Sequence, residues 1–173
     1  MKKILFLIAQ NNFRDEEFKK PKAILEKAGE SVCVASETTN VAVGKFGLQV
    51  MPDMGVSEAF RRVDEFKGVV VVGGGGCMAL ASNSYVMRLL KRAREKRKLI
   101  AAICWAPRVL AKAGVLKGLH VTASCEGTDS DIAKEICSKG AIFDDGNVVI
   151  DGRVITANGP AAASDFGEAI LKK

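Results

Sequence analysis

The stretch LIAAICWAPRVL, residues 99–110, constrains the fold of this chain more than any other part of the sequence. Leu99–Ile103 is an unbroken apolar run of strand length, which predicts a buried parallel strand. A helical pattern opens at Pro107, a residue that is tolerated in the first turn of a helix. Only Cys104 and Trp105 stand between the strand and the start of that pattern. A strand that breaks directly into a helix around a nucleophilic residue predicts a nucleophile elbow.

The small residues Ala102 and Ala106 flank Cys104 at two positions on either side, as a tight turn of this kind requires. A thiol at the start of a helix faces unpaired backbone N–H groups, which favour the thiolate. The alternative is that Cys104 is a small buried hydrophobic residue, as most free cysteines are. This stretch alone leaves both interpretations open.

Strands and helices alternate along the rest of the chain, which predicts one α/β domain over residues 1–173 with a mainly parallel sheet. A polar turn at residues 11–17 leads into a helix that ends at Gly29, and Thr128 with Asp131 resembles a capping box. The predicted strands cover residues 3–9, 31–35, 69–72, 99–103 and 121–124, with hairpins at 41–50 and 148–156. The other predicted helices cover residues 57–63, 83–97, 107–113, 128–138 and 163–171.

Composition excludes several classes of protein. Five cysteines without a CxxC pair and a single histidine, His120, give no cluster of metal ligands and indicate reduced, intracellular thiols. The apolar run Ile4–Ala9 is too short for a signal peptide core or a membrane span, so we expect a cytoplasmic protein without a membrane partner. The net charge is +6, and the densest basic run is KRAREKRK at residues 91–98. No aromatic residues interleave with this run, so we interpret it as a solvated helix end and expect no nucleic-acid partner.

Four polar or glycine-rich segments follow predicted strands. They are Glu17, Gly73–Gly76, Cys104 and the pair Ser124-Cys125. The carboxyl ends of parallel strands share one edge of a sheet, so these segments are expected to meet there. The glycine run also matches the GxGxxA dinucleotide pattern. It follows a middle strand, however, and the acidic residue about 20 positions later, Glu95, lies inside a helix, so a nucleotide cofactor is not expected.

Several segments together resemble the ThiJ/PfpI superfamily, which includes PfpI-type intracellular proteases, glyoxalases and protein deglycases. The resemblance covers nearly the whole chain. It rests on the opening KKILFLIA, the strand and loop VVVVGGGG, the nucleophile segment IAAICWAPRVLAKAGVLKG and the closing VIDGRVITANGP. It implies a flavodoxin-like open sheet with helices on both faces, and a homo-oligomer.

The resemblance also implies roles for individual residues. Cys104 corresponds to the nucleophile, and Glu17 to the carboxyl group that contacts it. Gly75 and Trp105 correspond to the positions whose backbone N–H groups form the oxyanion cradle. A carboxylate beside a thiolate is costly, so Glu17 is expected to be protonated and to donate a hydrogen bond to Cys104.

One departure from the family pattern bears on the activity. Protease-like members carry a histidine directly after the cysteine, where this chain has Trp105, and others carry one at the position of Ser124. His120 is expected at a strand end, so a peptidase activity is disfavoured. We expect a cysteine-dependent enzyme that acts on small reactive carbonyls or glycated protein groups, without a cofactor. The alternative is a redox sensor that uses Cys104 without turnover, with Cys125 as a candidate resolving thiol.

Overall fold

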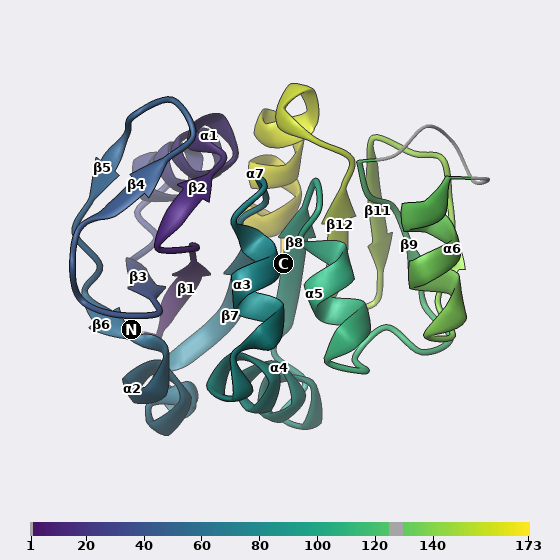
Figure 1. Ribbon diagram of the computed structural model, residues 1–173, viewed down its shortest axis with the longest axis horizontal. Coiled ribbons are helices and arrows are strands. Elements are labelled where there is room, and N and C mark those ends of the chain that lie inside the picture. The colour runs from purple at the N-terminus through teal and green to yellow at the C-terminus, as the bar shows by residue number, and fades with distance from the viewer. Residues whose placement is uncertain (1, 125–129) are drawn as a thin grey trace.

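The computed structural model describes residues 2–124 and 130–173 as an α/β domain around one central sheet (Figure 1). The seven strands of this sheet run in the order β11-β12-β8-β7-β1-β3-β6, and every pair is parallel except β11 with β12. In chain order they are β1 (Lys3–Leu7), β3 (Val32–Ser36), β6 (Met54–Gly55), β7 (Phe66–Val71), β8 (Leu99–Ile103), β11 (Val148–Asp151) and β12 (Val154–Ala157). The predicted mainly parallel sheet is therefore confirmed.

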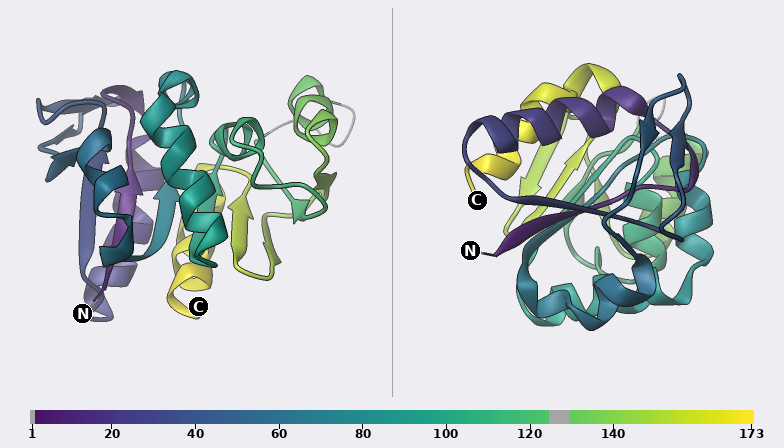
Figure 2. Two further views of the ribbon diagram at one scale, coloured as in Figure 1. Left: turned by 90° about the horizontal axis from the view of Figure 1, so that it is seen from below. Right: turned by 90° about the vertical axis from the view of Figure 1, so that its left-hand side faces the viewer.

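Helices cover both faces of the sheet. α1 and α7 pack together on one face, and α2 and α4 pack together on the other (Figure 2, right). The helices are α1 (Asp15–Lys27), α2 (Val56–Arg61), α3 (Cys77–Ser82), α4 (Ser84–Glu95), α5 (Pro107–Lys112), α6 (Asp131–Ser138) and α7 (Ala163–Leu171), with short 3-10 turns at Val63–Glu65 and Pro160–Ala162. None of the described helices is long and apolar enough to cross a membrane.

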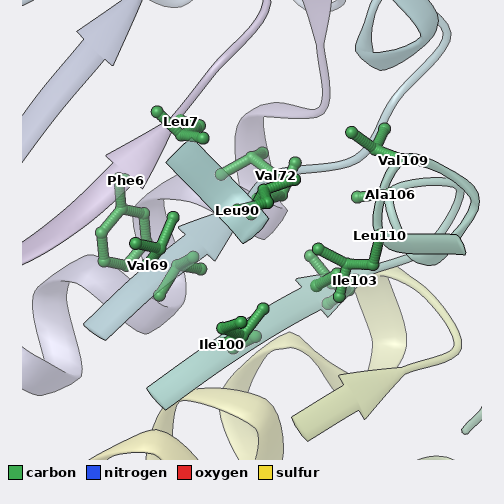
Figure 3. Packing of buried hydrophobic residues seen from close by; sticks show 14 of the residues in the cluster. Phe6, Leu7, Val69, Val72, Leu90, Ile100, Ile103, Ala106, Val109 and Leu110 are labelled. Atoms are coloured by element: carbon green, nitrogen blue, oxygen red, sulfur yellow. The ribbon is translucent and has the colours of Figure 1, made fainter. Parts of the chain in front are cut away.

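The core lies between the sheet and these helices. Apolar side chains from β1, β7 and β8 join those of α4 and α5 in one cluster, and Figure 3 shows Leu110 of α5 beside Ile103 of β8. All five residues of β8 are buried, as its unbroken apolar run predicts. β8 is consequently a fixed support for the residue that follows it.

Two smaller sheets extend the central one. The first contains β2 (Asn11–Phe13), β4 (Ala42–Gly44) and β5 (Gln49–Val50), and the second contains β9 (His120–Val121) and β10 (Ile142–Phe143). The hairpin predicted at 41–50 is confirmed by the antiparallel pairing of β4 with β5, and the one at 148–156 by the pairing of β11 with β12.

Some local predictions were wrong. Residues 11–13 form β2, not a polar turn, because β4 lies beside them and pairs with them. The strand predicted at 121–124 stops at Val121, since the next amide, that of Thr122, donates to the side-chain hydroxyl of Thr156 in β12 and not to a backbone carbonyl. The cap of α6 is Ser130, whose hydroxyl accepts from Ala133 N–H. Thr128 lies outside the described residues. The helix α3 and the short strand β6 were not predicted.

The topology places the reversal of strand order at β1. This strand pairs with β3 on one side and with β7 on the other. In open parallel sheets, ligands bind at the carboxyl ends of the strands where the order reverses. The segments after β1 and β7 contain Glu17 and the glycine run, so the fold brings these two predicted site segments to that crevice.

Candidate active site

Cys104 lies in the tight turn that the sequence predicts. It follows the last residue of β8 and has a backbone φ of +65°, a left-handed conformation that costs a non-glycine residue about 1–2 kcal/mol. The turn is held on both sides: Cys104 N–H donates to Ala157 O at 2.8 Å, and Cys104 O accepts from Ser124 N–H at 2.9 Å. The predicted nucleophile elbow is confirmed as a backbone geometry, and its strain is maintained by neighbouring segments.

Glu17 lies in the first turn of α1 and is completely buried. Neither of its carboxyl oxygens has a well-formed hydrogen bond to any residue that the structure describes. Its neighbours are the Cys104 side chain and Gly73. A β-carbon added at Gly73 would lie 2.4 Å from Glu17 Oε2 and 2.7 Å from Cys104 Cβ. The structure thus brings together the two residues predicted to carry the chemistry, although they lie 87 positions apart in the sequence.

The pKa values of both groups are raised. Burial raises the pKa of Glu17 to about 7, against partial compensation by the Cys104 side chain and the Arg14 charge. Burial, followed by the charge of Glu17, raises the pKa of the Cys104 thiol to about 11. The Gly74 amide and the Ser124 hydroxyl act in the opposite direction. Because the two groups are in contact, each of these two pKa values describes the loss of a proton from the pair and not from one residue alone.

The pair holds a single proton between these two pKa values. A carboxylate at Glu17 is stabilised by the Cys104 side chain and the Gly73 amide, and a thiolate at Cys104 is stabilised by the Gly74 amide and the Ser124 hydroxyl. That the remaining proton resides on Glu17 and leaves the sulfur as thiolate is the expectation from the sequence, and the pH dependence of Cys104 alkylation tests it.

A cavity of about 260 Å³ opens beside Cys104. This volume is below the range of about 300–1,000 Å³ that drug-sized ligands occupy, so the cavity suits a small molecule. Its described lining residues are Asn12, Arg14, Glu17, Lys45, Gly74, Gly75, Cys104, Trp105, Ser124 and Pro160. Gly75 and Trp105, the predicted oxyanion positions, thus lie at the cavity, and the amide that interacts with the sulfur is that of Gly74. The oxyanion roles of Gly75 and Trp105 remain predictions.

The glycine run serves a packing purpose. Gly76 N–H donates to Asn12 O, and Gly73 O accepts from Arg14 N–H, so the loop lies directly against β2. A β-carbon at Gly76 would be 1.9 Å from Asn11 O. These glycines permit the close approach of another backbone segment, which explains the run without a dinucleotide.

No imidazole lines the cavity among the described residues. His120 begins β9, half-exposed, and its Nδ1 lies 2.9 Å from Asp144 Oδ2. Trp105, the residue directly after Cys104, is 38% exposed, and the Arg108 guanidinium carbon lies 5.8 Å from the centre of its ring. The prediction that His120 is a strand-end residue is confirmed. Cys125, the candidate resolving thiol, lies outside the described residues.

Sequence reasoning missed three of the cavity residues as site residues. Asn12 lies on the unpredicted strand β2, and Lys45 lies in the predicted hairpin turn, whose position over the sheet edge has no sequence signal. Pro160 follows β12, the parallel neighbour of β8, so the strand-end rule could have identified it.

A larger groove of about 590 Å³ lies between α1 and β5. Its described lining contains no thiol, so size alone does not identify the reactive site.

Comparison with known proteins supports the resemblance. Residues 2–173 match the model of the DJ-1/PfpI family. An uncharacterised protein of Methanocaldococcus jannaschii is 37% identical over 98% of this chain and 81% of its own length. The crystal structure of a ThiJ/PfpI domain protein from Brachyspira murdochii is 32% identical with a TM-score of 0.91, covering 99% of this chain and 96% of that one. The structure of Drosophila melanogaster DJ-1beta is 32% identical with a TM-score of 0.87, covering 99% and 90%. The protein described here therefore belongs to the DJ-1/PfpI family.

Proposed function

We propose that this protein is a Cys104-dependent enzyme that converts small α-oxoaldehydes into 2-hydroxy acids. One observation carries the proposal. The Glu17 carboxyl is completely buried against the Cys104 side chain, and burial raises its pKa to about 7. A general acid or base works best when its pKa lies near the pH of operation. Glu17 can therefore both give and take a proton at the sulfur and at a carbonyl compound bound beside it.

The first step forms a bond between the sulfur and the aldehyde carbon. The Cys104 thiolate adds to the carbonyl, and the Glu17 carboxyl gives its proton to the oxygen, which yields a hemithioacetal. The negative charge that develops on this oxygen needs hydrogen-bond donors. The predicted donors are the backbone N–H groups of Gly75 and Trp105, which line the same cavity.

The second step moves hydrogen between two carbons. The Glu17 carboxylate removes the proton from the former aldehyde carbon, and the resulting enediol takes a proton at the neighbouring carbon. The product is a thioester of a 2-hydroxy acid, which water cleaves to release the acid and restore the thiol. One carbon is oxidised and its neighbour is reduced, so the reaction consumes one water and needs no external oxidant.

An amide substrate demands more than this site offers. Cleavage of a peptide requires an activated nucleophile and protonation of a poor leaving group, for which cysteine peptidases use an imidazole. The described lining of the cavity lacks one. Aldehydes are intrinsically electrophilic and have no leaving group, so the Cys104–Glu17 pair favours them. Glycated protein groups are the related substrates that the family resemblance implies.

The test is the formation of lactate from methylglyoxal, followed by NMR in D₂O. Wild-type protein should produce lactate with deuterium at C2, because the enediol takes that hydrogen from Glu17 and the solvent. Cys104→Ser and Glu17→Gln should abolish this product, whereas Cys137→Ser, which removes an exposed thiol, should leave it unchanged.

Two results would contradict the proposal. Lactate formed equally by Cys104→Ser would exclude the thiol from the reaction. No lactate from folded wild-type protein, together with rapid peroxide oxidation of Cys104 to the sulfenic acid, would favour the redox-sensing alternative.

A further inference from the structure

Three charged side chains line the Cys104 cavity among the described residues. They are Glu17, Arg14 and Lys45. Glu17 is buried beside the thiol and is neutral when protonated. The two cations come from different elements, because Arg14 precedes α1 and Lys45 lies in the turn between β4 and β5. The described lining is therefore cationic whenever Glu17 is protonated.

The charge of Arg14 already has partners. Its Nε lies 2.9 Å from Glu16 Oε2, and its guanidinium lies 4.8 Å from the centre of the Phe46 ring. These contacts orient the Arg14 side chain at the cavity. They also neutralise much of its charge, so an anionic ligand would have to compete with Glu16.

Lys45 is different. Its side chain is exposed and has no ion pair within the described part of the chain, and its ammonium lies 5.7 Å from the Phe46 ring centre. Its backbone is nevertheless fixed, since Lys45 N–H donates to Phe13 O at 2.8 Å. The same turn is held by Asp15, which accepts from Phe46 N–H and Leu48 N–H. The structure therefore presents an ammonium without a carboxylate partner on a rigid turn beside the nucleophile.

We propose that Lys45 is a specificity-determining residue that binds the carboxylate of the substrate, so that the preferred substrates are α-oxoaldehydes that carry a carboxylate group. This inference rests on the proposed function and names its substrate class. A cation at the mouth of a narrow cavity attracts anions and raises their local concentration. The carboxylate would face Lys45 while the aldehyde carbon faces the Cys104 sulfur.

Two alkylating reagents of similar size test the charge preference without any turnover. Iodoacetate and iodoacetamide both replace iodide with the Cys104 sulfur, but only iodoacetate is anionic. The rate of each would be measured at pH 6, where Glu17 is mostly protonated, and peptide mapping would separate Cys104 from the exposed Cys137 as an internal reference. We expect the iodoacetate-to-iodoacetamide rate ratio to be higher at Cys104 than at Cys137.

The variants sharpen this test. Lys45→Met should lower the ratio at Cys104 about three- to fivefold, the effect of an exposed charge, and 0.5 M NaCl should lower it in the wild type. Lys45→Arg should keep the ratio. Lys19→Met, which removes an exposed lysine that does not line the cavity, should leave it unchanged. An equal ratio in wild type and Lys45→Met would overturn the proposal.

Measurements of turnover distinguish a failure of this proposal from a failure of the proposed function. The kcat/KM for 4,5-dioxopentanoate, an anionic α-oxoaldehyde, would be compared with that for neutral methylglyoxal. We expect a preference for the anion that Lys45→Met reduces. Turnover of both compounds with no effect of Lys45→Met on their ratio would overturn the role of Lys45 alone. Charge-selective alkylation without turnover of either compound would overturn the proposed reaction and retain the anion site.

Discussion

The Glu17 carboxyl and the Cys104 side chain adjoin each other only because residue 73 is a glycine. A β-carbon at this position would lie 2.4 Å from Glu17 Oε2, 2.5 Å from Ile103 O and 2.7 Å from Cys104 Cβ. Two of these three atoms cannot easily move, since Ile103 O is backbone and Cys104 lies in a strained turn. Gly73 thus sets the separation of the acid and the nucleophile.

Gly73→Ala should therefore damage both stability and reactivity. Forcing a methyl group into this space is expected to lower the free energy of unfolding by about 1–3 kcal/mol, as overpacking does elsewhere, and to displace Glu17 from Cys104. Urea denaturation and the rate of Cys104 alkylation measure the two effects. Gly55→Ala is the matched control, because its backbone φ of −80° suits alanine and the nearest atom to the added β-carbon, Glu37 O, would be 3.7 Å away. Equal stability of the two variants would show that the loop adapts.

The buried carboxyl should make stability depend on pH. Burial raises the pKa of Glu17 from 4.5 to about 7, so the folded state prefers the protonated form. The stabilisation is complete below pH 4.5, decreases as the pH rises toward 7 and stays constant above it. At 1.36 kcal/mol per pKa unit, the loss is about 3 kcal/mol. Glu17→Gln removes this titration, so the stability of the variant relative to wild type should rise by that amount across the same interval. A difference that does not vary with pH would contradict the raised pKa.

The reactivity of Cys104 should follow the first proton lost by the pair. If that proton leaves the sulfur and Glu17 keeps the other, the rate of alkylation by iodoacetamide should rise with a midpoint near pH 7. In Glu17→Gln the proton must leave a buried thiol that has no neighbouring acid, so the midpoint should move upward. A wild-type rate that increases only above pH 9 would instead place the remaining proton on the sulfur.

The central elements could be predicted from the sequence because the apolar pattern of each element matches the burial of its residues in the structure. Leu99–Ile103 is apolar throughout and buried throughout, and Asn83, at the start of the helix predicted over residues 83–97, caps α4 through its side chain. The basic run at 91–98 is mostly exposed. Its last residue, Lys98, is buried and donates to Phe66 O, a contact that depends on a strand distant in sequence.

The candidate site was predictable only in part, because some of its residues reach the cavity through contacts with segments distant in the sequence. Cys104 and the glycine run have local signals, a strand end and a need for close backbone approach. Glu17 follows a strand end too, but it is one of three acidic residues in a first helical turn, where a solvated charge is the common role, and the resemblance distinguished it from Asp15 and Glu16. Lys45 reached the cavity through the pairing of β2 with β4, which local sequence does not specify.

The turn that carries Lys45 depends on a second buried carboxylate. Asp15 is buried, and its two oxygens accept from Phe46 N–H at 3.0 Å and Leu48 N–H at 2.9 Å. Gly44 lies so close that a β-carbon there would be 2.6 Å from Asp15 Oδ2. Asp15 thus holds the β4–β5 turn against the start of α1.

Asp15→Ala should release this turn. Loss of the acceptors leaves two N–H groups without partners, which should cost about 1–3 kcal/mol and speed hydrogen exchange at Phe46 and Leu48 by at least about tenfold. Asp144→Ala, at an exposed carboxylate paired with His120, should change stability by less than about 0.5 kcal/mol. Because Lys45 would no longer be fixed beside Cys104, Asp15→Ala should also reduce the preference of that thiol for iodoacetate. Unchanged exchange at both amides would mean that strand pairing and the Lys45–Phe13 backbone hydrogen bond suffice to hold the turn.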